Sequence, residues 1–364
     1  MASSPRMPLK VGLVGFGYAG QTFHAPLLQA TPGLTLCAVA SRQGEAVRQA
    51  LGQDVQVVAD SASLLADPAL DLIVIASPND SHFPLAQAAL QAGKAVVVDK
   101  PLALDRAQAA ALVALARSTG RLLSVFHNRR WDGDFLTVAR CLRSGALGRL
   151  TQARLCFDRY RPVVRTRWRE SAVPGAGLWS DLGPHLIDQA LQLFGPPQNL
   201  RAELIVQRSG AVVDDQFTAQ LCYPQGLRVT LQASQLAALP GPRFELHGEQ
   251  GSLRSWGLDA QEDDLKAGLR PDPAMPEAWG RHHGQTELML ADEAGQPRRL
   301  DLPLQAGRYT AYYAQLRDAL CGLADNPVRP EEALDVMRWL DLGRLSASTG
   351  RTLGLADLDA AGPD

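Results

Sequence analysis

The chain has 364 residues, a length typical of two domains that each bury a core of their own. Its 36 Lys and Arg residues nearly balance 38 Asp and Glu residues, and the net charge of -2 gives no basic face for nucleic acid and no polybasic patch for a membrane surface. No apolar run approaches the roughly 18 residues that a membrane-spanning helix needs.

Cysteine usage indicates a reducing compartment. The five cysteines are odd in number and widely spaced, at Cys37, Cys141, Cys156, Cys222 and Cys321. None forms a Cys-x-x-Cys pair, so neither a disulfide framework nor a bound metal is expected. The first eight residues carry no apolar stretch of the kind found in signal peptides. We therefore expect a cytoplasmic protein.

The N-terminal third alternates short apolar runs with helical stretches. Strands are predicted at residues 10–14, 34–40, 72–76, 95–98 and 122–126, and helices at 22–29, 45–51, 83–92 and 106–118. The apolar runs are continuous, as expected for parallel strands covered by helices on both faces. The repeated strand–helix order predicts an α/β fold, with a doubly wound Rossmann domain over residues 1–126.

After residue 126 the pattern changes to alternating strands. A helix is predicted at residues 135–144, strands at 150–158, 201–208, 218–222, 228–234 and 244–248, and closing helices at 309–323 and 331–349. Residues 258–285 are predicted as a long loop, and residues after 355 as frayed. The second domain, 127–364, is expected to be α+β with a mostly antiparallel, open sheet. The closing helices are candidates to pack back on the Rossmann domain.

A glycine-rich loop follows the first predicted strand and precedes a helix. It has the sequence Gly15-Phe16-Gly17-Tyr18-Ala19-Gly20. In this context one glycine makes the tight turn, one lets the backbone approach a pyrophosphate, and one lets helix pack on strand. The pyrophosphate then lies at the helix N-terminus, which favours anions. The loop predicts a bound dinucleotide.

The end of the second strand selects between NAD and NADP. An NAD site places Asp or Glu about 20 residues beyond the glycines, to bind the ribose hydroxyls. This chain has Ser41 and Arg42 there, 21 and 22 residues after Gly20. Arg42 can bind a 2′-phosphate through paired charge-assisted hydrogen bonds, so we expect NADP(H). The alternative is a surface arginine beside a loop.

A third loop, Ser77-Pro78-Asn79-Asp80-Ser81-His82, follows the predicted strand that ends at residue 76. Since strand C-termini face the ligand crevice in such sheets, Ser77, Pro78, Asn79 and His82 are candidate cofactor-binding residues. Asn79 is equally suited to cap the next helix, and His82 to start it. His24 is expected to be structural.

The motif Asp99-Lys100-Pro101, which follows the strand predicted at 95–98, is the first of several that resemble those of a known family. With Ser77-Pro78-Asn79, Asn128-Arg129-Arg130-Trp131-Asp132 and the stretch 177–185, it resembles the Gfo/Idh/MocA oxidoreductases over residues 10–355, and most of all their NADP-dependent scyllo-inositol dehydrogenases. The resemblance implies that Lys100, Asp181 and His185 act at the reacting carbon, and that the open sheet forms a homodimer or homotetramer interface. Asp99 replaces the usual Glu, and Ala176 interrupts a usual run of glycines.

The residues themselves support such a site. His suits proton transfer near neutral pH, and Asp181 and His185 are four positions apart at the start of a helix. Pro184 favours a first-turn position, which would place Asp181 near the N-cap. The alternative is that Asp181 merely caps the helix and His185 is partly buried.

Arginines and aromatic residues in the matching stretches offer donors and flat surfaces for a polyhydroxy ring. Arg129, Trp131, Arg161 and Arg167 are therefore candidate substrate residues, together with the three catalytic candidates, and Asn128, Trp168 and Lys100 are assigned to the cofactor. Arginines in such runs are more often ion-paired or at the surface.

The sequence thus predicts an oxidoreductase that transfers hydride between NADP(H) and a polyol or keto-polyol, of the scyllo-inositol/inosose type. Two alternatives stay open. One is a related reductase of a sugar or anhydro-ketose, and the other is a cofactor-binding regulator without turnover.

Overall fold

A computed structural model describes residues 8–275 and 278–361. The expectation that the N-terminus is not a signal peptide concerns residues 1–8, and residues 1–7 lie outside the described ones. The chain divides into two compact units. The first comprises the described residues of Met1–Trp131, Ala260–Gly280 and Arg308–Leu334, and the second those of Asp132–Asp259, Arg281–Gly307 and Asp335–Asp364. Two later segments of the chain therefore pack with the N-terminal one.

The first unit contains a six-stranded, wholly parallel sheet of order β3-β2-β1-β4-β5-β6. Its strands are β1 (Leu9–Val14), β2 (Leu34–Ala40), β3 (Gln56–Val58), β4 (Leu72–Ile75), β5 (Ala95–Asp99) and β6 (Leu123–Phe126). This is the doubly wound sheet that the sequence predicts. β3 was not predicted, because three half-exposed or exposed residues give no apolar run.

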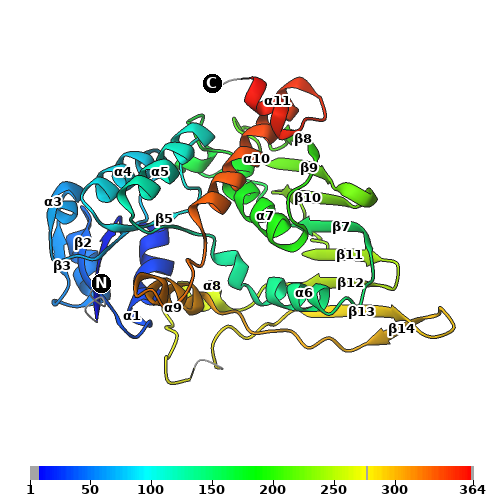
Figure 1. Cartoon of the computed structure of the whole chain (residues 1–364), viewed down its shortest axis with the longest axis horizontal. Helices are drawn as coiled ribbons and strands as arrows, with labels where there is room; N and C mark the ends of the chain where they lie inside the picture. The colour runs from blue at the N-terminus through cyan, green and yellow to red at the C-terminus, as the bar shows by residue number, and fades with distance from the viewer. Residues whose placement is uncertain (1–7, 276–277, 362–364) are drawn as a thin grey trace. The chain divides into compact units, whose positions relative to one another are not determined.

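Helices cover both faces of this sheet. They are α1 (Ala25–Gln29), α2 (Gly44–Leu51), α3 (Ser61–Ala66), α4 (His82–Gln91) and α5 (Arg106–Thr119). α3, α4 and α5 lie along one face and α1 along the other (Figure 1). This double cover explains why β4 is buried at all four positions. The helix predicted at 22–29 begins earlier, as a π-helical turn at Gly20–His24 that continues into α1.

The second unit contains an eight-stranded sheet of order β14-β13-β12-β11-β7-β10-β9-β8. Its strands are β7 (Leu150–Cys156), β8 (Asn199–Ile205), β9 (Gln216–Cys222), β10 (Arg228–Ser234), β11 (Phe244–Gly248), β12 (Gly251–Trp256), β13 (Gln285–Ala291) and β14 (Pro297–Leu300). All pairings among these strands are antiparallel except that of β7 with β10, which confirms the mostly antiparallel sheet.

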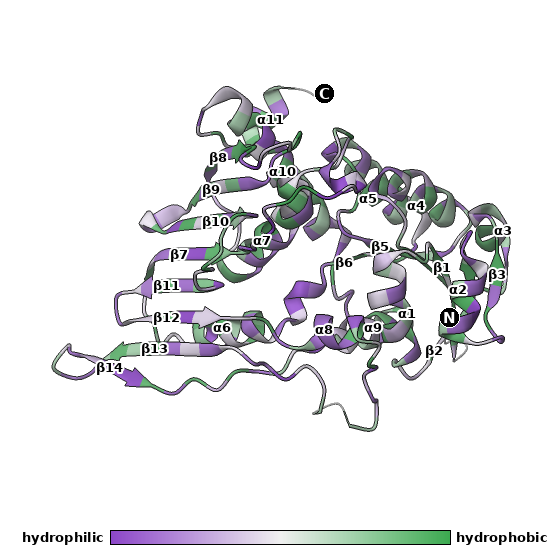
Figure 2. Cartoon of the chain, turned by 180° about the vertical axis from the view of Figure 1, so that it is seen from behind, coloured by the Kyte–Doolittle hydropathy of each residue, from purple (hydrophilic) through white to green (hydrophobic). Residues whose placement is uncertain are grey.

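The two faces of this sheet differ in polarity. In β9, Phe217, Ala219 and Leu221 are buried, while the alternate positions Thr218 and Gln220 are half-buried or exposed. The buried face packs against α6 (Gly133–Arg143) and α7 (Leu178–Phe194). Purple and green segments alternate along these strands in Figure 2, as this two-sided arrangement requires.

Three expectations for the later part of the chain were wrong. The predicted loop at 258–285 contains α8 (Gln261–Lys266), whose mostly polar sequence gives no amphipathic signal. The first residues of the segment expected to be frayed form α11 (Leu355–Ala360), because Asp357 bonds back to the amide of Gly354, and residues 362–364 lie outside the described ones. The strands β12, β13 and β14 were missed. The closing helices are α9 (Tyr309–Leu320) and α10 (Pro330–Thr349). Among the described residues, no helix is both long and apolar enough to cross a membrane.

Two glycines of the loop after β1 are expected to differ in how much stability the same substitution costs. A Cβ on Gly20 would lie 2.2 Å from the backbone oxygen of Gly15, whereas nothing lies within 4 Å of a Cβ on Gly17. Gly20→Ala should therefore destabilise the fold by about 1–3 kcal/mol, despite the better helix propensity of Ala. Gly17→Ala should stay within about 0.5 kcal/mol of the parent. Urea unfolding measures both, and equal effects would contradict the loop geometry.

Candidate functional site

The first unit presents its candidate site where the strand order reverses. β1 and β4 are neighbours, so the loops that follow them start side by side. Gly15 has a φ of +93°, and a Cβ there would lie 2.7 Å from the carbonyl oxygen of Ala76. Only glycine allows this approach. The empty space beside Gly17 is what a pyrophosphate needs to reach the loop backbone, so this loop fits a dinucleotide.

The loop after β2 carries Ser41 and Arg42. The amide of Ser41 donates to the carbonyl of Val58, and its hydroxyl accepts from the amide of Gln43 at 3.0 Å. These bonds fix the turn, while Arg42 lies exposed at its outer side. The next two residues, Gln43 and Gly44, add no carboxylate that would repel a phosphate. The turn leaves a guanidinium at the place where NAD-binding folds carry an acid.

The loop after β4 holds Ser77, Pro78, Asn79 and His82 together. Asn79 is 7% exposed in a 3₁₀ turn, Asn79–Ser81, and no side chain caps the start of α4. His82 is fully buried, with Nδ1 2.7 Å from the carbonyl of Pro101 and Nε2 3.0 Å from that of Ser77. Burial lowers the pKa of His82, although Asp99 and the two carbonyls act against the shift. The ring therefore joins this loop to the Lys100 loop.

Lys100 follows β5 directly, and its backbone is tied to its neighbour. The amide of Lys100 donates to Asp99 Oδ1 at 2.9 Å, and the Lys100–Pro101 peptide bond is cis. Asp99 Oδ1 also lies 3.8 Å from Nε2 of His24, whose other ring nitrogen is 2.6 Å from the Tyr313 hydroxyl. His24 is thus a buried structural residue, as expected.

Asp99 is an ionised carboxylate in a buried position. Burial by itself raises its pKa, but the neighbouring imidazole of His24 and the charge of Lys100 hold that pKa below the usual range. A fixed negative charge next to Lys100 favours the ammonium form of the lysine. The replacement of Glu by Asp in this motif therefore keeps the charge.

Asn128, Arg129 and Trp131 lie in one buried 3₁₀ turn, Asn128–Trp131. The guanidinium of Arg129 forms an ion pair of 2.9 Å with Glu262 of α8. The ring of Trp131 packs edge-on against Tyr312 at 5.3 Å between centroids. Any contact of Arg129 with a substrate would have to coexist with its ion pair.

The second unit carries Asp181 and His185 one turn apart on α7. The N-cap of α7 is Gly177, so Asp181 lies inside the first turn and Pro184 within the helix. The sequence prediction placed Asp181 near the N-cap and Pro184 in the first turn, and it was wrong by about one turn. The helix starts earlier because Gly177, with a φ of +94°, makes the turn that the prediction gave to Pro184. His185 is buried, at 6% exposure.

The start of α7 is capped from a distant segment. Asp214 Oδ2 accepts from the amide of Trp179 at 2.6 Å, and the Asp214 carbonyl accepts from the amide of Leu178. A Cβ on Gly177 would lie 2.1 Å from Asp214 Oδ1, so a larger residue does not fit. Burial raises the pKa of Asp214, even though the Trp179 amide and Arg344 act to lower it. Asp214 thereby fixes the turn that bears Asp181.

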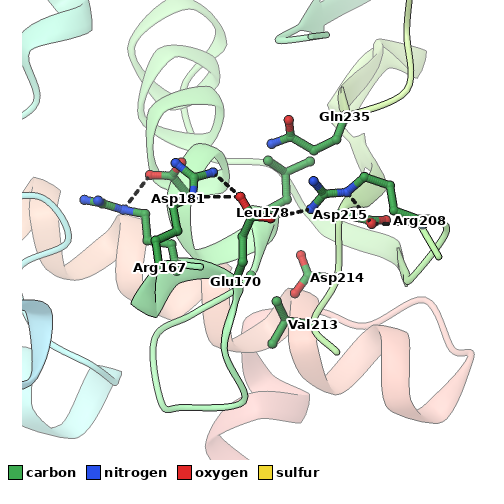
Figure 3. Close-up of a pocket in the computed structure, with 11 residues that line it drawn as sticks. Arg167, Glu170, Leu178, Asp181, Arg208, Val213, Asp214, Asp215 and Gln235 are labelled. Atoms are coloured by element: carbon green, nitrogen blue, oxygen red, sulfur yellow. Dashed lines mark hydrogen bonds and ion pairs between the residues drawn. The ribbon is translucent and has the colours of Figure 1, made fainter. Parts of the chain in front are cut away.

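A small polar hollow lies beside this turn (Figure 3). Its charged lining consists of Arg167, Arg169, Arg208, Glu170, Asp181, Asp214 and Asp215. Arg208 is nearly buried and reaches Asp215 at 2.8 Å and Glu170 at 3.2 Å. Arg169 lies 3.4 Å from Asp181. Paired charges and their remaining donors and acceptors make a wall suited to hydroxyl groups.

The remaining candidates of this unit lie on one segment. Arg167 pairs with Glu170 at 2.6 Å and lines the hollow, whereas Trp168 stacks under the guanidinium of Arg169 at 4.6 Å. Burial, with the charges of Arg165 and Arg167, lowers the pKa of Arg161. An acceptor or an anion nearby would stabilise the guanidinium of Arg161, because like charges surround it.

The structure thus groups the glycine loop, Ser77–Asn79 and Lys100 in the first unit, and Arg167 and Asp181 around one hollow in the second. Sequence reasoning missed Glu262, Arg208, Asp214 and Asp215. The adjacent acids Asp214-Asp215 between two strands were a usable signal, but nothing local singled out Glu262. Within the described ranges, no group of three or more His, Cys, Asp or Glu side chains is placed to hold a metal.

Comparisons with known proteins agree with this architecture. The family model described as an oxidoreductase family with an NAD-binding Rossmann fold, GFO_IDH_MocA, matches residues 9–127. The model of the GFO/IDH/MocA C-terminal domain matches residues 135–254. The solved structure of YPO2259 from Yersinia pestis superposes with a TM-score of 0.91 at 47% identity, covering 97% of this chain and 99% of that one.

Two curated relatives align over nearly their whole length. The uncharacterized oxidoreductase YdgJ of Escherichia coli is 49% identical over 96% of this chain and 99% of its own. The scyllo-inositol 2-dehydrogenase (NADP(+)) IolW of Bacillus subtilis is 34% identical over 95% and 96%. A nucleotide-binding unit, a second unit with an open sheet and these matches lead to one conclusion: the chain is an oxidoreductase of the Gfo/Idh/MocA family.

Proposed function

We propose that the protein transfers hydride between NADP(H) and a polyol or keto-polyol, of the scyllo-inositol/inosose type. The observation that carries the proposal is the polar hollow beside Asp181, in the unit that follows the nucleotide-binding one. Its arginines and carboxylates are donors and acceptors of the kind that bind the hydroxyl groups of a polyol. The name of the relative IolW supports the same substrate class.

The choice of NADP(H) over NAD(H) rests on the turn after β2. Arg42 is exposed there, and neither Ser41 nor Gln43 adds a negative charge. A guanidinium binds a 2′-phosphate through two parallel hydrogen bonds, and it gains nothing comparable from a ribose hydroxyl. IolW, whose name includes NADP(+), supports this preference, whereas the description of the Rossmann family model names NAD.

The proposed chemistry gives each catalytic candidate one task. A nicotinamide, when bound, supplies the hydride acceptor for oxidation or the hydride donor for reduction. In oxidation, the imidazole of His185 takes the hydroxyl proton while the hydride leaves the same carbon, so that a C=O bond forms. The ammonium group of Lys100 hydrogen-bonds the reacting oxygen and stabilises the negative charge that develops on it. Asp181 holds Lys100 or a neighbouring hydroxyl of the substrate.

Further residues are proposed to contact the substrate or the cofactor. Arg129, Trp131, Arg161 and Arg167 contact the substrate, and Asn128, His82 and Trp168 support the cofactor. Lys100 and His185 can also exchange these two roles: Asp99 lies next to the lysine, and α7 positions the histidine. Cysteine usage supports a cytoplasmic location.

Two other functions compete with this one. A related reductase would use the same groups on a sugar or an anhydro-ketose, and a regulator would bind the cofactor without turnover. Consumption of NADPH, measured against a panel of inososes, keto-sugars and anhydro-ketoses, separates all three. Turnover that is fastest with an inosose supports the proposal, and tight NADPH binding without turnover on any compound favours the regulator.

The catalytic assignment predicts a specific loss. Positioned acid–base groups contribute about 10²–10⁴-fold to rate, so Lys100→Ala and His185→Ala should each lower kcat at least about 100-fold. Cofactor affinity should change little, since neither group is assigned to the phosphates. The variant that lacks the true base should also lose one limb of the pH profile of kcat/KM. Turnover near that of the parent, with intact folding, would refute the assignment.

The cofactor assignment predicts a selective effect of Arg42→Ala. A charge-assisted contact with phosphate is worth about 1.5–3 kcal/mol, so the Kd of NADPH should rise on the order of 10–150-fold. The Kd of NADH should stay nearly constant. Arg121→Ala is a matched control, because Arg121 is exposed at the opposite, amino-terminal end of the strands. Equal weakening of both cofactors in calorimetric titrations would count against the assignment.

We further propose that the polar face of the eight-stranded sheet joins copies of the chain into a dimer or tetramer. Its exposed and half-buried positions, such as Thr218, Gln220 and Thr230, form a polar surface that is available to a partner. Light scattering at micromolar concentration should give a dimeric or tetrameric mass, and Thr230→Arg should reduce it. A monomeric mass for the parent protein would overturn this proposal.

A further inference from the structure

A tyrosine of the glycine loop is anchored to a residue 244 positions later in the chain. The hydroxyl of Tyr18 donates to Glu262 Oε1 at 3.2 Å, and its ring packs edge-on against Phe23 at 5.9 Å between centroids. Tyr18 is nevertheless 54% exposed, so burial alone does not hold its side chain. The hydrogen bond and the ring contact fix the middle of the loop from outside.

Glu262 is itself held from two sides. Arg129, whose side chain is 7% exposed, reaches Glu262 Oε2 at 2.9 Å, and Lys266 reaches Oε1 at 2.9 Å. Burial alone would raise the pKa of Glu262, but the charges and hydrogen bonds of Arg129 and Lys266 bring it down to about 2. The carboxylate therefore accepts from three donors at once and is charged at any pH at which the protein works. All four residues belong to the first unit.

The contacts of Glu262 with Tyr18 and Arg129 are more than is needed to hold α8 in place. A six-residue helix is held by burial of Leu265 and Gln261, whereas the Glu262 carboxylate accepts from a side chain of the glycine loop, the segment that is proposed to bind the pyrophosphate. A flexible glycine loop loses conformational freedom when it binds, and a side-chain anchor reduces that loss in advance.

We propose that Glu262, fixed by Arg129 and Lys266, is a positioning residue for the cofactor. Through the Tyr18 hydroxyl it holds the glycine loop in its pyrophosphate-binding conformation and slows the release of the dinucleotide. The proposal rests on the dinucleotide site of the proposed function, but on neither the NADP preference nor the substrate.

Two variants test it with a binding readout. Tyr18→Phe removes only the hydroxyl and leaves the Arg129–Glu262 pair intact, while Glu262→Gln removes the charge. Each should raise the dissociation rate of NADPH, and of NADH in equal proportion, by about threefold to tenfold in stopped-flow displacement. The double variant should be no faster than the faster of the two single variants, because both changes weaken the same contact. Asp263→Asn is the control, since Asp263 is 86% exposed and contacts Lys266 but not Tyr18.

The possible outcomes separate this proposal from its alternatives. If Tyr18→Phe lowers the melting temperature but leaves both dissociation rates unchanged, the contact only braces α8 and the proposal fails. Additive effects in the double variant would also overturn it, because they show independent sites. An effect on NADPH alone would move Glu262 to the recognition of the 2′-phosphate and contradict the proposal. Failure of Arg42→Ala to discriminate between the cofactors affects only the NADP assignment.

Discussion

The close approach of the loop after β1 to the end of β4 is the constraint on which the nucleotide-binding side depends. Gly15 lies so near the carbonyl of Ala76 that a single methyl group does not fit between them. This contact sets the loop at the reversal of strand order and brings it next to the Ser77–His82 loop. His82 links the Ser77–His82 loop in turn to Pro101, so the loops after β1, β4 and β5 are connected to one another.

How far the sequence predicted the fold depended on how strongly each element is buried. β1, β2, β4, β5 and β6 were predicted because helices cover both their faces and leave an unbroken apolar run. β3 and β14 have no fully buried position, and α8 is mostly charged, so local composition carried no sign of them. Tertiary pairing creates these elements, and a window of sequence does not contain the partner.

The candidate site divides along the same line. The sequence predicted those candidate groups that lie on one short segment, such as the glycine loop and Lys100 after β5, because a motif and the order of the strands are enough to locate them. The start of α7 did not, because Gly177 and a residue from another segment set it and Pro184 suggested a different register. Glu262 and Arg208 were missed for a related reason. Glu262 acquires its role from an ion pair with Arg129, 133 positions earlier, and Arg208 from ion pairs with Asp215 and Glu170.

The cap that Asp214 places on α7 bears on how the chain tolerates engineering. The segment between β8 and β9 looks like an ordinary surface hairpin connection, the kind of place chosen for an epitope tag, a domain insertion or new chain termini. Yet its last residues hold the first turn of the helix that bears Asp181. A cut or insertion next to Asp214 would thus release that turn while every proposed catalytic side chain stayed in the sequence. Permutation points belong instead in connections such as Asp292–Gln296, the exposed turn between β13 and β14.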